Sequence, residues 1–269
     1  MASGQHQKRP TFQFWRESAQ LLDNSPRTPM LRTSLGKPFN KVCVMVSPFD
    51  PSIEQLPAVL PIFPLPGALL LPRGNLPLNI FEPRYVAMIN AALKTDTRMI
   101  GMIQPADAEG DPSPQNLCRV GCAGRISSFS ETDDGRFMLQ LTGVIRFSVD
   151  REIEMESGFR RVFPNYERFH NDLAPTPDME GIDRDTLMAA TKNYFEANSY
   201  DTDWDALEKT SVLTLVTSLA MACPFDVMEK QALLEAENPV DRAAVLTSLL
   251  QMGAAAGMGE DGDGDISLN

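Results

Sequence analysis

The sequence predicts an α+β fold in which a small, barrel-like β domain is followed by a bundle of helices. The first indication is an apolar stretch, Leu60–Pro72, that prolines divide into pieces too short for a helix. The second is Phe137–Val149, where apolar and polar side chains alternate as they do in a half-buried strand. The third is a series of helix-start signals in the last third of the chain. With 269 residues the chain is long enough for one large or two small domains.

We expect the β-rich domain to span residues 57–170. Proline cannot donate a hydrogen bond to a neighbouring strand, so the short strands of Leu60–Pro72 and Leu76–Phe81 belong at edges or corners of a small barrel. The period becomes helical from Pro83 to Leu93, and one face of this helix is apolar, with Tyr85, Met88, Ile89 and Ala92. Residues 97–103 are expected to form another strand.

The clearest strand is Phe137–Val149. Its inward positions are Phe137, Leu139, Leu141, Gly143, Ile145, Phe147 and Val149, and its outward positions include Gln140, Thr142, Arg146 and Ser148. Asp134-Gly135 is a typical hairpin turn, so residues 124–132 should form the antiparallel partner. Residues 151–169 should add one or two more strands.

A linker at residues 171–182 should lead into a helical bundle at 183–256. We expect four helices, at about 183–198, 205–222, 226–236 and 239–254, because N-capping residues or a helix-favouring proline precede or open several of them. Residues 1–56 lack any sustained period and are expected to be a disordered leader, with Met45 a credible true start. Residues 257–269 are rich in Gly and Asp and are expected to be a disordered acidic tail.

Composition and charge favour a cytoplasmic protein and disfavour several functions. The net charge is −12, and residues 171–256 carry five Lys/Arg against fifteen Asp/Glu, so this half should repel nucleic acid. No apolar run approaches the roughly 20 residues that cross a bilayer. The N-terminus lacks a secretory signal. The four cysteines, Cys43, Cys118, Cys122 and Cys223, are too dispersed for a disulfide framework and fit a reducing compartment.

The residues that catalysis or cofactor binding would need are scarce. The histidines are His6 and His170, so neither a His-based triad nor a multi-histidine metal site is available. The sequence contains neither a P-loop nor a Gly-x-Gly-x-x-Gly motif. Cys118 and Cys122 lack the second pair typical of a zinc site. We therefore expect no catalytic residues, no cofactor and no metal.

A binding surface is the remaining possibility. The proline-broken segment Leu69–Leu78 would form exposed apolar corners, and the 14 Met side chains are flexible enough to contact varied partners. The alternative is that these leucines and methionines belong to the core, where such side chains usually lie.

Two separated motifs resemble one known family. The segment Leu60–Leu93, above all Ile80-Phe81-Glu82-Pro83-Arg84-Tyr85, is similar to the signature of the Lon substrate-binding (LON N-terminal) domain family. The Pro-Leu-Pro-Gly opening at 64–67 and the glycines of the hairpin, Gly124 and Gly143, resemble it too. Residues 229–242 resemble the helical end of the family. The resemblance covers about residues 57–255.

This resemblance implies a PUA-like β pseudo-barrel followed by a C-terminal helical bundle. It also implies a non-catalytic module that captures unfolded or damaged polypeptides for protein quality control, with a Lon-type or other protease as a partner. Neither an ATPase motor nor a Ser–Lys peptidase region follows, so capture is expected without unfolding or cleavage. The candidate polypeptide-binding or family-defining residues are Leu69, Leu71, Leu76, Phe81, Glu82, Arg84 and Tyr85. Glu82 and Arg84 should pair across the strand-to-helix turn and hold Phe81 and Tyr85 in the core.

An RNA-binding PUA-like module is the alternative function. Similar barrels occur in RNA-binding proteins, and residues 117–168 contain Arg119, Arg125, Arg136, Arg146, Arg151, Arg160, Arg161 and Arg168. The nearly balanced charge of this domain indicates instead that its arginines pair with the intervening acids. A peptidase inferred from the family name alone would lack a nucleophile and a base.

Overall fold

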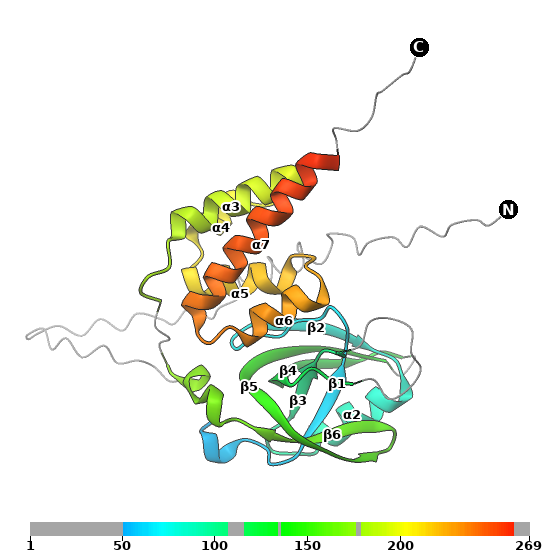
Figure 1. Cartoon of the computed structure of the whole chain (residues 1–269). Helices are drawn as coiled ribbons and strands as arrows, with labels where there is room; N and C mark the ends of the chain where they lie inside the picture. Colours follow the sequence, from blue (N-terminus) through cyan, green and yellow to red (C-terminus); the bar gives the residue numbers. More distant parts are fainter. Residues whose placement is uncertain (1–50, 107–115, 134–135, 176–178, 261–269) are drawn as a thin grey trace, which may run out of the picture. The chain divides into compact units, whose positions relative to one another are not determined.

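The computed structural model describes residues 51–106, 116–133, 136–175 and 179–260 (Figure 1). The expected leader up to residue 50 with Met45, the Asp134-Gly135 turn and residues 261–269 of the expected tail lie outside these ranges. Residues 51–56, which we expected to be disordered, contain a short 3-10 helix, η1 (Ile53–Gln55). None of the helices within the described ranges combines the length and the apolar character needed to cross a membrane.

Six strands form the β domain: β1 (Leu60–Pro64), β2 (Asn75–Ile80), β3 (Met99–Ile103), β4 (Val120–Glu131), β5 (Phe137–Glu156) and β6 (Phe159–Asn165). Their order is β2-β5-β4-β3-β1-β6, and β6 also pairs with β5. The strands β5, β4, β3, β1 and β6 therefore close into a ring, to which β2 adds an edge strand. The pair β1–β3 is parallel and the other pairs are antiparallel. The predicted barrel-like β domain is thus confirmed (Figure 1).

Strand β5 is 20 residues long and pairs with different strands along its length. Its first part pairs with β2 and β4, as the predicted hairpin requires, and its second part pairs with β6. The register shifts in its pairing with β4 between Ala123 and Gly124 and with β6 between Val149 and Arg151. Such bulges bend a strand, which lets one strand take part in both sides of a closed ring.

The prolines of β1 lie in a strand with neighbours on both sides, although we expected them at a sheet edge or corner. Pro77 of β2 is on an edge strand, as predicted, but β1 has a partner on each side. Pro61 is in register only with β6, and Pro64 only with β3. Because each proline faces a partner strand on one side only, the missing N–H groups are tolerated inside the ring.

The barrel is filled by the strands, by helix α2 and by a loop. Helix α2 (Pro83–Leu93) buries Tyr85, Met88, Ile89 and Ala92, the predicted face, and packs against β1, β3 and β6. The loop Leu69–Leu71 is buried against two glycines of the hairpin. A Cβ atom on Gly124 would meet the Leu70 side chain, and one on Gly143 would collide with the Leu71 carbonyl. Because these glycines have no side chain, the loop can pack directly against β4 and β5.

The helical part consists of η2 (Glu167–Leu173), α3 (Arg184–Ala197), α4 (Trp204–Lys209), α5 (Val212–Ala222), α6 (Val227–Glu235) and α7 (Pro239–Glu260). The single helix expected at 205–222 is wrong, because the chain forms α4 and α5 there. Ser211 begins α5, where its Oγ accepts the Thr214 N–H at 3.2 Å. Helix η2 lies in the segment that we expected to be strand and linker.

Helix α7 continues past the end that we expected near residue 254. Its glycines face α3 at a close approach: a Cβ atom on Gly253 would lie 2.5 Å from the Tyr194 ring, and one on Gly257 would lie 2.8 Å from the Ala197 carbonyl oxygen. Figure 1 shows the two helices side by side, and they pack against each other along their length. Both glycines thus permit close helix packing, and Gly257 does so where the sequence suggested a tail.

The substitution Gly253→Ala should destabilise the protein. Helix propensity alone predicts a gain of about 1 kcal/mol for this change. The added methyl would instead have to displace the buried ring of Tyr194, at a typical cost of about 1–3 kcal/mol for overpacking. Thermal unfolding followed by circular dichroism measures the sign, and a raised melting temperature would show that α3 and α7 are not in close contact at this position.

Candidate functional site

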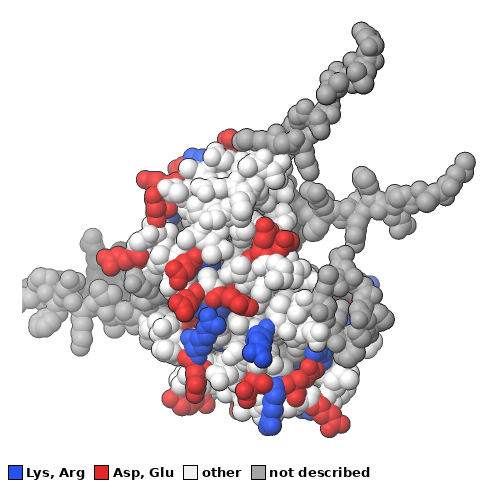
Figure 2. Space-filling model, viewed as in Figure 1, with Lys and Arg blue, Asp and Glu red and all other residues white. Residues whose placement is uncertain are grey.

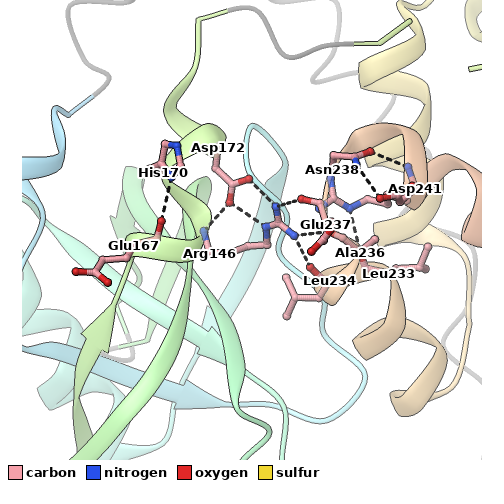
Figure 3. Close-up of polar contacts among 11 residues, drawn as sticks. Arg146, Glu167, His170, Asp172, Leu233, Leu234, Ala236, Glu237, Asn238 and Asp241 are labelled. Atoms are coloured by element: carbon pink, nitrogen blue, oxygen red, sulfur yellow. Dashed lines mark hydrogen bonds and ion pairs between the residues drawn. The ribbon is translucent and has the colours of Figure 1, made fainter. Parts of the chain in front are cut away.

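Arg146 of β5 points outward from the barrel, as the alternation predicts, but its side chain is not exposed. Only 2% of the residue is accessible, because η2 and the end of α6 cover this part of the strand. An arginine side chain carries five N–H donors. In Arg146 each of them has an acceptor (Figure 3). Arg146, Asp172 and the end of α6 therefore form a buried contact between the barrel and the helices, which we call the joint.

One set of acceptors comes from η2. The Arg146 Nε and Nη2 donate to the two carboxylate oxygens of Asp172 at 2.9 and 2.8 Å, and the Arg146 backbone N–H donates to Asp172 as well, at 3.0 Å. The guanidinium lies over the ring of Phe169, 4.6 Å from its centroid. Two-pronged pairing in a buried site combines charge with fixed geometry. Asp172, which we placed in a linker, thus joins η2 to the barrel.

The other acceptors are backbone carbonyls at the end of α6. Nη1 donates to Leu234 at 3.0 Å and to Ala236, and Nη2 donates to Glu237 at 3.1 Å. The last carbonyls of a helix have no partner within the helix, and this end carries partial negative charge. A buried cation at this place satisfies both needs.

Further buried polar side chains bind α6 and α7 to the same region. Arg242 of α7 donates from Nε to the Leu233 carbonyl at 2.9 Å. Burial lowers the pKa of Arg242 to about 10, and the nearby charge of Arg146 adds to the effect. The Lys230 ammonium donates to the Gly67 carbonyl at 2.7 Å. Burial lowers the pKa of Lys230 too.

Two glutamines complete this contact. Gln231 of α6 donates to the Val120 carbonyl of β4 at 3.2 Å. Gln104 donates to Gln231 at 3.2 Å and to the Val227 carbonyl at 3.0 Å, and accepts the Gly67 N–H at 3.2 Å. These four contacts hold α6, the loop after β1 and the barrel together. The segment 229–242, which carried the second motif, therefore makes the joint.

The thiols and the histidine described near the joint are not activated for catalysis. Burial raises the pKa of the Cys122 thiol and raises that of Cys223 to about 12, so both thiols stay protonated. His170 is exposed, and its Nδ1 contacts the Glu167 carbonyl at 3.0 Å (Figure 3). In the part of the chain that the structure describes, no three His, Cys, Asp or Glu side chains are grouped to hold a metal ion.

A surface open to partners lies at the other end of the strands. Ile80 of β2, Phe137 of β5 and Glu131 of β4 lie side by side in register. We call this end of the three strands the distal end. Gly74, which packs against Met221 of α5, is six residues before Ile80, or about 20 Å along an extended strand.

Large apolar side chains are exposed at the distal end. Phe81 directly follows Ile80 and is 64% accessible, and Met138, next to Phe137, is 58% accessible. Phe129, two residues before Glu131, is 51% accessible, and its ring centroid is 6.4 Å from that of Phe137. Phe129 lies opposite Leu139 and points to the same face of the sheet as Phe137, whereas Met138 points to the other face. The exposed apolar side chains therefore surround the end of the strands, and exposed groups of this kind typically mark contact sites.

The candidate residues of the proline-rich segment lie elsewhere. Leu69, Leu71 and Leu76 are buried, so the exposed corners that we expected are wrong for these three. Leu71 and its neighbour Leu70 lie against the hairpin glycines Gly143 and Gly124. A polypeptide cannot reach them in this conformation.

Among the candidates from Phe81 to Tyr85, the predicted Glu82–Arg84 pair and the buried Tyr85 are confirmed, but the position of Phe81 is not as predicted. Arg84 pairs with Glu82 at 2.8 Å, and both side chains are about half exposed, so the pair contributes at most about 1 kcal/mol. Tyr85 is buried, with its ring 4.2 Å from that of Phe63 and under the Arg84 guanidinium. The expectation that Phe81 is in the core is wrong, because it lies beyond the end of β2 on the surface.

Sequence reasoning missed Phe129 and Met138. A signal existed for Met138, because the alternation of Phe137–Val149 puts it on the outer face, where an apolar side chain is unusual. Phe129 gave no such signal, since the register shift between Ile126 and Ser128 changes the alternation of β4 just before it.

Several of the arginines that suggested RNA binding are engaged within the protein. Arg160 binds both oxygens of Glu152 at 2.6 Å, and Arg161 binds Glu156 at 2.5 Å. Arg151 lies over the Phe163 ring. Figure 2 shows basic and acidic side chains next to one another on the barrel and mostly acidic ones over the helices. This pattern favours pairing within the domain over a phosphate-binding surface.

Replacing Arg146 should destabilise the whole protein. Arg146→Met keeps the packing over Phe169 but leaves a buried carboxylate and three carbonyls without their donor, which typically costs about 3–5 kcal/mol. Arg161→Ala is the control, because this partly exposed pair should cost less than about 1 kcal/mol. Urea unfolding of both variants gives the two values, and equal losses would show that the joint is not a main source of stability.

The comparisons with known proteins agree with this arrangement. The family model described as the ATP-dependent protease La (LON) substrate-binding domain matches residues 59–252. The Lon protease of Elusimicrobium minutum is 26% identical over 208 residues, which are 74% of this chain and 24% of that protease. The Lon protease of Anaeromyxobacter dehalogenans is 34% identical over 107 residues, 39% of this chain and 12% of that protease. The chain thus spans about a quarter or less of the length of these relatives.

Solved structures share the fold. The Lon N-terminal domain protein from Xanthomonas campestris superposes with a TM-score of 0.50 at 22% identity, over 71% of this chain and 97% of that one. The N-terminal domain of the Mycobacterium avium complex Lon protease gives the same TM-score at 14% identity. The closed ring with its edge strand, the α6–α7 joint and the family match over residues 59–252 lead to one conclusion: the chain belongs to the LON substrate-binding domain family.

Proposed function

We propose that this chain is a non-catalytic polypeptide-binding module that holds unfolded or damaged protein segments at its distal end. It would serve protein quality control in the reducing cytoplasm, by itself or as an adaptor for a Lon-type or other protease. The observation that carries the proposal is the exposed apolar surface around the distal end, to which Met138 of β5, Phe129 of β4 and Phe81, directly after β2, contribute.

The make-up of this surface suits unfolded chains. Unfolded segments expose apolar side chains without a fixed shape, and a Met side chain adapts to varied shapes because it is flexible and polarisable. The phenylalanines add large apolar areas. The exposed ion pair of Glu82 and Arg84 borders Phe81 and keeps the surrounding surface polar. A weak, adaptable apolar contact with a polar border is the pattern expected for a binder with many clients.

The rest of the molecule supports a binding role rather than catalysis. The buried thiols stay protonated, and the buried cations bind carboxylates or backbone carbonyls inside the joint. The part of the Lon relatives that the family model describes is their substrate-binding domain. For this chain, capture of a polypeptide therefore follows from the fold more directly than any reaction does.

Substitutions at the distal end should weaken binding of an unfolded protein. We expect Met138→Ser to weaken the affinity for reduced, carboxymethylated lactalbumin about fivefold and Phe81→Ser about tenfold, in line with the loss of apolar anchors worth roughly 1–1.4 kcal/mol. Fluorescence anisotropy with the labelled protein measures both values.

The control is Met252→Ser on α7, because Met252 is 59% accessible, almost the same as Met138. This variant should bind within twofold of the unsubstituted chain. No binding by the unsubstituted chain, or equal losses for the Met138 and Met252 variants, would contradict the proposal.

A further inference from the structure

The outer half of β4 has an open edge. Strand β3 pairs with β4 only from Cys122 to Arg125, and the last backbone bond on this side joins the Ile126 N–H to the Arg98 carbonyl at 2.9 Å. From there to Glu131, β4 pairs with β5 alone among the described residues. All residues from 127 to 131 are exposed. An edge of this kind can accept another strand.

The register of β5 decides which backbone groups face the edge of β4. Gly143 donates its N–H to the Gly74 carbonyl at 2.8 Å, so Gly143 bonds toward β2, and so does every second residue from there to Phe137. The residues between them, Met138 and Gln140, therefore bond in the opposite direction, toward β4.

In β4, Ser130 and Ser128 lie opposite Met138 and Gln140 and use their backbone groups toward β5. The backbone N–H and C=O groups of Phe129 and Glu131 consequently point away from β5, to the open edge. Their spacing is the repeat of an extended chain, about 7 Å for two residues.

The opposite edge of the same three strands is blocked. By the same register, Asn75, Pro77 and Asn79 of β2 face away from β5. Pro77, in the middle of these three, has no N–H to donate, which is the usual way in which proteins protect an edge strand. Two edges of one sheet thus differ in their ability to pair.

Apolar side chains lie beside the open edge. Phe129 itself lies at the distal end, and its ring is next to that of Phe137. An extended polypeptide added along β4 would bond its main chain to Phe129 and Glu131 and place alternate side chains against Phe129. Main-chain bonds bind any sequence, and the apolar contact selects unfolded chains.

We propose that residues 127–131 of β4 take up an extended segment of an unfolded polypeptide as an added strand. This inference rests on the proposed function and specifies how the client is held. The occupant is an extended chain because the groups on offer are a strand's own donors and acceptors at a strand's own spacing.

The test removes one outward N–H from each edge. Glu131→Pro deletes a donor at the open edge without removing a bond to β5, and Asn79→Pro deletes the equivalent donor at the blocked edge. Glu131→Ala loses the carboxylate but keeps the donor. We expect the Glu131→Pro variant to bind reduced, carboxymethylated lactalbumin about tenfold more weakly than the Glu131→Ala variant, and the Asn79→Pro variant to bind it within twofold of the unsubstituted chain.

Amide hydrogen exchange of the unsubstituted chain, followed by NMR, gives an independent result that does not depend on whether a proline variant folds. On addition of the same unfolded protein, exchange at Phe129 and Glu131 should slow at least tenfold, and exchange at Ser128 and Ser130 should hardly change. Unchanged exchange at Phe129 and Glu131 would overturn the inference.

The outcomes separate this inference from the proposed function. If the unfolded protein binds and Phe81→Ser weakens it, but Glu131→Pro equals Glu131→Ala, capture stands and strand addition is refuted. If the unsubstituted chain does not bind at all, both fall. If Phe129 and Glu131 are protected in the chain alone and sedimentation shows a dimer, a second copy occupies the edge, and the proposed occupant is wrong.

Discussion

The buried guanidinium of Arg146 imposes the strictest constraint on this structure. A charge removed from water is costly unless every donor finds a partner. For Arg146 these partners are a carboxylate of η2 and the last carbonyls at the end of α6, so these two segments have to meet at one point of β5. This requirement helps to fix the positions of η2 and of the end of α6 on the barrel.

The same constraint decides which surfaces are open. Around Arg146 the outer face of β5 is covered, and Lys230 and Gln104 hold the loop that follows β1 between the barrel and α6. The leucines of that loop therefore fill the interior. The opposite end of β2, β5 and β4 has no such cover within the described ranges, and Phe81, Phe129 and Met138 stay accessible there. The closed joint and the open distal end are two consequences of one arrangement.

Local patterns in the sequence predicted much of the fold. The alternation in β5, the apolar face of α2 and the N-cap of α6 depend on residues only a few positions apart. The contacts that the sequence did not reveal join distant segments. Arg146 and Asp172 are 26 positions apart, and Arg146 and Leu234 are 88 apart. No pattern within β5 shows that an outward arginine will be covered by a helix end from so far along the chain.

The site was predicted less well for the same reason. Phe81 was singled out by its motif but was expected inside, whereas Leu69, Leu71 and Leu76 were expected outside. The place of Leu71 depends on Gly143, a residue from another part of the chain whose missing side chain leaves room for the Leu71 backbone. Gly257 likewise was assigned to a tail, although it lies in α7 where α3 comes close. A glycine gives the same sequence signal for a turn and for a close contact.

The most direct test of the account is to locate where an unfolded protein touches the chain. A photo-crosslinking amino acid placed at position 81 or 138 should form crosslinks to reduced, carboxymethylated lactalbumin, whereas the same group at the exposed positions 228 of α6 and 252 of α7 should form few or none. Crosslinks mainly from positions 228 and 252, or equal yields from all four, would contradict the claim that the distal end captures polypeptides.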